Sequence, residues 1–321
     1  MAEFLLEFEK PLAELRKKID ELKNFTKDKS IDAGEEIKRL EEKAVKMKDE
    51  IYSGLTPWQV VQIMRHPHRP KTLDFINLML EDFKEMHGDR AFKDDKAMVG
   101  GMARLEGRPV MAVGLQKGKD TKENLLRNFG CGFPEGYRKA LRLMKLAEKF
   151  GMPVLTFIDT TGAFPGIEGE ERGVAEAIAR NLLEMSRLKV PIIVCVIGEG
   201  GSGGALGIGV GDRILMMKYA TYSVISFEGC AAIIWRDASK APDAVKALKA
   251  TADDLYRMKI IDKIIDEPME GAHTNHKAAA ENLKKAIAEG LDELCALPEK
   301  GLVKKRYEKF RKMGVFSDEK K

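Results

Sequence analysis

The stretch GEGGSGGALGIGVGD, Gly198 to Asp212, has eight glycines in fifteen residues and follows the apolar run VPIIVCVI, Val190 to Ile197. Glycines where a buried strand ends and a helix begins leave backbone N–H groups unpaired and unobstructed, so they can donate to an oxygen that becomes negative during a reaction. Adjacent amides of this kind form an oxyanion hole. From the residues alone, a tightly packed turn with nothing bound explains the glycines equally well.

The GxGxxG pattern of dinucleotide sites is also present, at Gly198, Gly200 and Gly203. Such a site needs an acidic residue about twenty positions further on, to bind a ribose hydroxyl, and this chain has Tyr222 there. Glu199 also puts negative charge in the loop that would receive a pyrophosphate. Both features argue against a dinucleotide site.

The GxSxG pattern of serine hydrolases is satisfied by Gly200, Ser202 and Gly204, with His273 later in the chain. A segment this rich in glycine and serine matches the pattern easily by chance. His273 stands in the polar stretch PMEGAHTNH, which is typical of a surface loop. A serine hydrolase is an alternative hypothesis, and replacing Ser202 by alanine tests it.

Composition limits the class of protein that carries these glycines. The 321 residues, 44% of them hydrophobic, suffice for one large core with an extension, and a formal charge of +4 is too balanced to indicate a nucleic-acid partner. The four cysteines show no CxxC spacing, so we expect neither a zinc site nor a disulfide framework. Neither a signal peptide nor a long apolar segment is apparent, and we expect a cytoplasmic protein.

The pattern of apolar residues predicts how the chain is organised. Apolar residues at three- and four-residue spacing in the first fifty residues predict two helices that fold as a hairpin, within an N-terminal extension over 1–55. Between them and a basic tail, 296–321, we expect one α/β domain over 56–295. Its predicted elements are a helix over 72–86, a strand hairpin over 97–118, a helix over 134–150, a strand over 152–158, a helix over 168–188, and strands over 191–197, 213–217 and 221–226.

Several segments together resemble one family, the α subunits of bacterial acetyl-CoA carboxylase carboxyltransferases. The similar segments cover nearly the whole chain; they include FEKPLAELRKKI, RHPHRPKTLDF, GDRAFKDDKAMVGG, FIDTTGAFPG, EERG, IGEGGSGGAL, VGDRILM and YSVISFEGCAAIIW. The resemblance implies a crotonase-like (ClpP/crotonase) fold, a spiral of strand-strand-helix units, with the N-terminal helical hairpin added to it.

The resemblance also implies a reaction and its participants. The carboxyl group of carboxybiotin, carried on a separate biotin carboxyl carrier protein, moves to acetyl-CoA and gives malonyl-CoA for fatty acid synthesis. Biotin carboxylase supplies the carboxybiotin, and a zinc-containing β subunit, in an α2β2 assembly, contributes most of the acyl-CoA side. No metal is implied in this chain.

The same resemblance assigns the site residues. The paired catalytic amides correspond to Gly203 and Gly204, which would hold the ureido oxygen of biotin. Beside them, the cofactor-binding residues are expected in two loops, at Gly162, Ala163, Phe164, Gly166, Gly201 and Ser202. Because the freed ureido nitrogen can take the methyl proton of acetyl-CoA, no protein base is required.

Two residues depart from the family pattern, which has proline at the positions of Thr161 and Phe227. Proline fixes φ and removes a donor, so these changes bear on loop rigidity near the site. A non-catalytic assembly subunit with a disabled pocket is therefore a further alternative hypothesis.

Other candidate residues have simpler explanations. We expect His66 and His68 to lie in a basic loop rather than on a metal, Glu168 to favour a helix start, and Cys230 to be buried. The basic residues of the 134–150 helix fit a solvated face better than a phosphate site; they are Arg138, Lys139, Arg142 and Lys145.

Overall fold

The computed structural model describes residues 4–29 and 33–314. At its centre is an eight-stranded sheet in the order β1-β2-β3-β4-β5-β6-β8, with β7 paired to β5. The pairs β1–β2 and β2–β3 are antiparallel, and β3, β4, β5, β6 and β8 run parallel. The strands are β1 (Glu81–Glu85), β2 (Met98–Leu105), β3 (Arg108–Leu115), β4 (Val154–Thr160), β5 (Ile192–Gly201), β6 (Arg213–Met217), β7 (Thr221–Ser223) and β8 (Lys263–Ile265).

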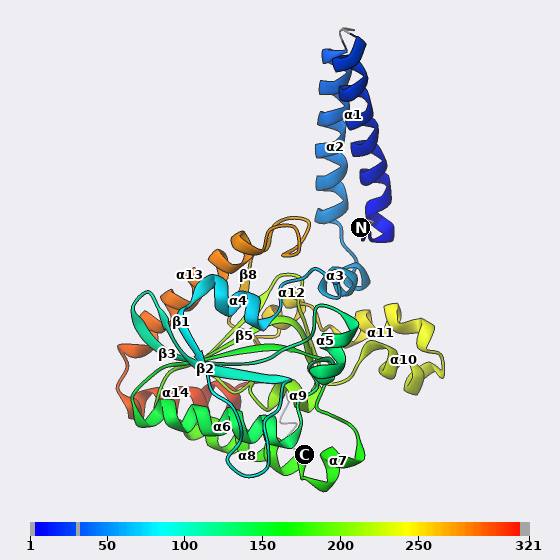
Figure 1. Cartoon of the computed structure of the whole chain (residues 1–321). Helices are drawn as coiled ribbons and strands as arrows, with labels where there is room; N and C mark the ends of the chain where they lie inside the picture. The colour runs from blue at the N-terminus through cyan, green and yellow to red at the C-terminus, as the bar shows by residue number, and fades with distance from the viewer. Residues whose placement is uncertain (1–3, 30–32, 315–321) are drawn as a thin grey trace, which may run out of the picture.

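Helices cover both faces of the sheet (Figure 1). On one face lie α6 (Pro134–Lys149), α8 (Val174–Arg187) and α14 (Glu299–Arg311); on the other lie α4 (Thr72–Met79) and α13 (His276–Cys295). The parallel strands read as continuous apolar runs because both of their faces are buried, and β4 and β5 are buried at every residue. Further α-helices of this domain are α3 (Pro57–Met64), α5 (Thr121–Leu126), α7 (Ile167–Glu171), α9 (Ser202–Leu206), α10 (Phe227–Trp235), α11 (Ala241–Leu248) and α12 (Ala252–Arg257).

The predicted N-terminal hairpin is present as α1 (Lys10–Lys29) and α2 (Gly34–Ser53), which project away from the sheet domain (Figure 1). Its base is attached by ion pairs from Arg16 and Lys48 to Glu270, at 2.7 and 2.8 Å. Among the described residues, these contacts between the hairpin and the domain lie at one end of the hairpin.

Several predicted elements differ from the structure. The helix expected over 72–86 ends at Met79, and the edge strand β1 follows it. The helix expected over 168–188 is divided into α7 and α8, because Gly173 adopts a left-handed φ of 76°. The strand expected over 221–226 ends at Ser223, where the chain turns toward the Ser226 N-cap of α10.

The C-terminal segment expected as a basic tail is helical as far as Arg311 and packs against the sheet domain. Arg306, 1% exposed, makes a two-pronged ion pair with the buried Asp212, with nitrogen–oxygen distances of 2.9 and 2.7 Å. Its guanidinium also donates to the carbonyl oxygens of Met185, Leu188 and Val190. This part of the tail is thus integral to the fold.

Candidate active site

Two adjacent parallel strands bring the predicted site loops together. The loop Gly162–Gly166 follows β4, and α9 follows β5. Because the two strands are parallel neighbours, both segments begin at the carboxyl-terminal side of the sheet. The loops touch through their backbones: a Cβ added to Gly204 would lie 2.3 Å from the carbonyl carbon of Gly162 and 2.5 Å from the nitrogen of Ala163. Only glycine permits this approach.

The turn between β5 and α9 exposes the backbone amides that the sequence singled out. Ser202 has a φ of 50°, a left-handed conformation that is strained for a residue with a side chain. The N–H groups of a helix's first turn have no partner inside the helix, and within the described residues no other backbone acceptor faces the N–H of Gly203 or Gly204. The backbone of the described residues therefore uses neither amide as a donor.

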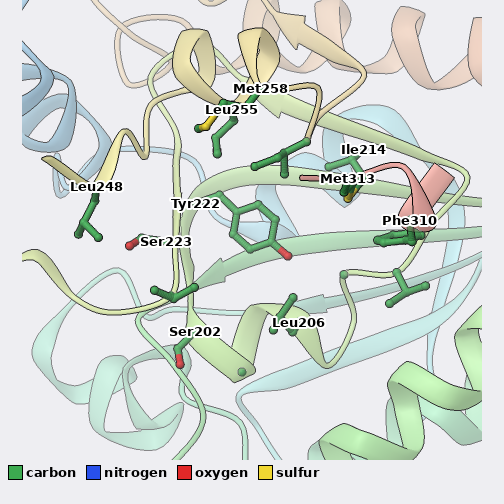
Figure 2. A pocket seen from close by; sticks show the side chains of 15 residues that line it. Ser202, Leu206, Ile214, Tyr222, Ser223, Leu248, Leu255, Met258, Phe310 and Met313 are labelled. Atoms are coloured by element: carbon green, nitrogen blue, oxygen red, sulfur yellow. The ribbon is translucent and has the colours of Figure 1, made fainter. Parts of the chain in front are cut away.

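A largely apolar cavity of about 540 Å³ opens beside Gly203 (Figure 2). Ser202 and Leu206 of α9 line one side, and side chains from distant elements close the others: Tyr222, Val224, Leu248, Leu255, Met258, Phe310 and Met313. Gly204 is buried and does not line this cavity. An apolar ligand group in the cavity would thus lie against the backbone of residue 203.

The loop after β4 is ordered by its own contacts. The Thr160 hydroxyl donates to the carbonyl oxygen of Gly162 at 2.7 Å, and the N–H of Phe164 donates to the carbonyl oxygen of Gly132 at 3.0 Å. The Phe164 ring packs against Phe133, with ring centroids 4.1 Å apart. The N–H of Ala163 has no acceptor among the described residues, so it is a further candidate donor next to Gly204.

A network of buried charges lies beneath the two loops. Lys117, just after β3, places its Nζ 3.0 Å from Asp159 Oδ1 and 3.1 Å from Glu199 Oε2. Burial alone would raise the pKa of Asp159, but Lys117 and Lys71 hold it below its ordinary value. Burial likewise opposes the charge on Lys117, yet the two carboxylates raise the pKa of its ammonium above the usual value.

The same network changes how Glu199 is interpreted. The sequence suggested a negative charge that disfavours anions in the glycine loop. In the structure the Glu199 side chain is 8% exposed, and its carboxylate is also bound by Arg65 at 3.1 Å. Its charge is therefore neutralised by two cations.

The serine hydrolase triad is not assembled. His273 lies outside the cavity beside Ser202, in a separate polar cavity of about 300 Å³ at the base of the N-terminal hairpin. Its ring stacks on that of His66, with centroids 3.7 Å apart. That hypothesis is wrong, because no imidazole of the described residues reaches Ser202.

The remaining candidates have structural partners. Lys139 is buried and pairs with Asp94, and Arg138, Arg142 and Lys145 also bond to neighbouring segments, so the α6 face is not the solvated face that we expected. Cys230 is buried as expected.

Within residues 4–29 and 33–314, no group of three or more His, Cys, Asp or Glu side chains is arranged to hold a metal ion. No helix of these residues is long and apolar enough to cross a membrane.

Sequence reasoning missed Tyr222 as a site residue. Its ring projects into the middle of the cavity (Figure 2). Burial raises the pKa of its phenol to about 12, so the hydroxyl stays neutral. The ring reaches the cavity because β7 pairs with the end of β5, where Tyr222 lies opposite Gly200. No local sequence pattern predicts that pairing.

Phe227, one of the two departures from the family pattern, does not enter the cavity. Its ring is 1% exposed and packs with Val61 and Met64 in a second apolar cluster. The replacement of proline at this position therefore leaves the cavity walls untouched.

Comparisons with known proteins agree on one family. The family model described as acetyl co-enzyme A carboxylase carboxyltransferase-like matches residues 5–314. The acetyl-coenzyme A carboxylase carboxyl transferase subunit alpha of Geobacter metallireducens is 56% identical over 317 residues, covering 99% of both chains. That of Aliivibrio salmonicida is 56% identical over 312 residues, covering 96% of this chain and 98% of the relative.

Solved structures share the fold at low identity. A transcarboxylase 12S structure superposes with a TM-score of 0.56 and 21% identity, covering 69% of this chain and 41% of that one. The Pseudomonas malonate decarboxylase MdcD-MdcE heterodimer gives a TM-score of 0.56 at 17% identity, over 68% of this chain and 89% of that one. These matches confirm the predicted crotonase-like α/β fold.

Proposed function

Because the chain belongs to the acetyl co-enzyme A carboxylase carboxyltransferase-like family, we propose that its Gly203 and Gly204 amides stabilise the negative charge that carboxyl transfer creates on biotin. Members of this family, this chain included, are carboxyltransferase alpha subunits of acetyl-CoA carboxylase. The alternative hypothesis of a non-catalytic assembly subunit is therefore set aside.

Carboxybiotin enters this site as a substrate on its carrier protein. When its carboxyl group leaves the ureido nitrogen, the bonding electrons make the ureido oxygen more negative, so donors placed at that oxygen act most strongly in the transition state. The carboxyl carbon bonds to the methyl carbon of acetyl-CoA, and the methyl proton passes to the freed nitrogen. The chain then has to bind and orient biotin and supply donors.

The observation that carries the proposal is the position of Gly203. Its N–H has no acceptor among the described residues, and the residue lines an apolar cavity of about 540 Å³. The fused rings and valeryl chain of biotin are apolar apart from the ureido edge, so they suit such a cavity while that edge faces the backbone. Gly201 and Ser202 shape the turn. The loop with Gly162, Ala163, Phe164 and Gly166 does not line this cavity; it supports the turn from the side of Gly204.

The partners and compartment complete the proposal. A zinc-containing β subunit would hold most of acetyl-CoA, in an α2β2 assembly, and biotin carboxylase would charge the carrier, all in the cytoplasm. The subunit alpha designation of the relatives supports a partner subunit. If the site is shared, reverse transfer from malonyl-CoA to free biotin requires both subunits, and turnover by either alone contradicts this arrangement.

A backbone donor is tested by replacing its N–H with an oxygen, which cannot donate. Incorporating glycolic acid at position 203 turns that amide into an ester while the rest of residue 203 is kept. In the assembled carboxyltransferase, losing one oxyanion donor should lower kcat for reverse transfer about 10²- to 10³-fold. Gly203→Ala keeps the N–H and serves as the comparison, because it changes the same residue without removing the donor; the ester variant should be the slower of the two. An ester variant with the kcat of Gly203→Ala would refute the proposal.

A further inference from the structure

The pairing of β4 with β5 is interrupted just before the site. Ile158 lies opposite Val196, but Thr160 lies opposite Gly200, so Asp159 alone faces three residues of β5. An irregularity of this kind bends the strand and changes where the following residues point. Here the following residues are the turn at Ser202 and the two candidate amides.

Asp159 holds the irregular segment in place. Its Oδ1 accepts the backbone N–H of Glu199 at 3.1 Å. A Cβ added to Gly198 would lie 2.5 Å from the same oxygen, so the neighbouring residue has to be glycine. The carboxylate therefore fixes the backbone of β5 from the side of β4.

Lys117 connects this carboxylate to a second one. Its Nζ lies between Asp159 Oδ1 and Glu199 Oε2, at 3.0 and 3.1 Å, and the carboxylate side chains are 4% and 8% exposed. Lys71 is the other cation near Asp159, at 3.9 Å, and Arg65 is the other cation on Glu199, at 3.1 Å. Among the described residues, Lys117 alone bridges both carboxylates.

Any movement of these strand ends reaches the site loops directly, because the loops are in backbone contact. A Cβ at Gly201 would lie 2.2 Å from the carbonyl oxygen of Thr161, and one at Gly204 would lie 2.3 Å from the carbonyl carbon of Gly162. The contact is made by backbone atoms, with no side chain between them. The separation of β4 and β5 thus sets the position of residues 203 and 204.

We propose that Lys117 is a positioning residue for carboxyl transfer: by bridging Asp159 and Glu199 it fixes the end of β5 and hence the direction of the Gly203 and Gly204 amides. This inference rests on the proposed function of those amides. Lys117 itself does not line the cavity, so it acts through Asp159 and Glu199 rather than on the ligand.

The test uses Lys117→Met in the assembled carboxyltransferase, assayed by reverse transfer from malonyl-CoA to free biotin. Two buried carboxylates then face each other without their shared cation, and displacement of the amides should lower kcat about 10- to 100-fold. KM for biotin should change less than about twofold, because the cavity walls are untouched. The control Lys119→Met removes an exposed lysine two positions away, which pairs with Asp74, and should leave kcat unchanged.

A second variant and a pH profile separate positioning from a loss of stability. Adding Glu199→Gln to Lys117→Met removes the repulsion and should restore most of the lost kcat. In Lys117→Met alone, kcat should rise as pH is lowered, because one of the two carboxyls then takes up a proton. The kcat of the wild type should show no such rise.

The outcomes distinguish this inference from the proposed function. If the ester at residue 203 lowers kcat but Lys117→Met does not, the amides are functional and the role of Lys117 is wrong. A Lys117→Met variant whose kcat is not restored by Glu199→Gln also overturns it. If the ester variant is fully active, the proposed function and this inference fail together.

Discussion

The nitrogen of Ala163 lies 2.5 Å from the position that a Cβ on Gly204 would occupy, whereas a Cβ on the neighbouring Gly203 meets only Ile178 Cδ1, at 3.6 Å. The two glycines that the sequence paired therefore have different reasons to be glycine. Gly204 lets two backbones touch, and Gly203 has room for a side chain.

This difference predicts opposite results for the same substitution. Gly204→Ala should lower the free energy of unfolding by about 2–4 kcal/mol, because backbone has to move to relieve the overlap. Gly203→Ala should leave it equal or raise it by about 0.5–1 kcal/mol, since alanine favours helix. Urea denaturation of the two variants measures both values. Equal stabilities would show that the loops separate without cost.

The stacked pair His66 and His273 predicts a loss of stability in acid. Burial, then the neighbouring His66 and Arg69, lower the pKa of His273 from 6.5 to about 4, and Glu270 and His68 also face it. The unfolded chain therefore binds a proton between about pH 6.5 and 4 that the folded chain does not, so stability falls as pH falls through this window. Allowing for partial solvent exposure, the loss by pH 4.5 should be about 1–2 kcal/mol.

The matched variant is His273→Phe, which keeps a ring on His66 but cannot titrate. Its melting temperature should fall less than that of the wild type between about pH 7 and 4.5. Parallel curves for the two proteins would mean that His273 is protonated in the folded state without cost.

The buried pair Arg306 and Asp212 predicts that the C-terminal helix is required for stability. Arg306→Met leaves the Asp212 carboxylate buried without its cation, which should cost about 3–5 kcal/mol. Arg306→Lys should not restore it, because a single ammonium cannot reproduce the fork of bonds to Asp212 and three carbonyls. Thermal denaturation checks both, and a double variant with Asp212→Asn should lose less than Arg306→Met alone.

Local patterns predicted the elements that depend on local physics. The β2–β3 hairpin was predicted over 97–118. Its turn residues, Glu106 and Gly107, adopt the positive φ, 51° and 77°, that a tight two-residue turn requires. The apolar runs predicted β4 and β5 because a strand that is buried on both faces is apolar throughout. The family resemblance then predicted the two loops that the structure brings together.

What could not be predicted depends on contacts between distant segments. Gly198 is glycine because Asp159, 39 positions earlier, occupies the space of its side chain. The cavity is closed by Phe310 and Met313, from a segment expected to be a tail. Neither relation leaves a periodic signal in the sequence, because each joins residues that only the folded sheet brings together.

Tyr222 offers the last test, of the cavity itself. Its hydroxyl has no hydrogen-bond partner in the described part of the chain, and its ring stands inside the cavity. If biotin binds there, this neutral phenol is the polar group best placed to contact it. Tyr222→Phe should raise KM for free biotin in the reverse reaction about 3- to 10-fold, the effect of one neutral hydrogen bond. It should leave the melting temperature unchanged because no internal bond is broken.

Tyr219→Phe is the matched control: the Tyr219 hydroxyl donates to the carbonyl oxygen of Met269 at 2.8 Å, outside the cavity. That variant should lose stability and keep the wild-type KM. A wild-type KM in Tyr222→Phe would show that biotin does not reach the centre of this cavity.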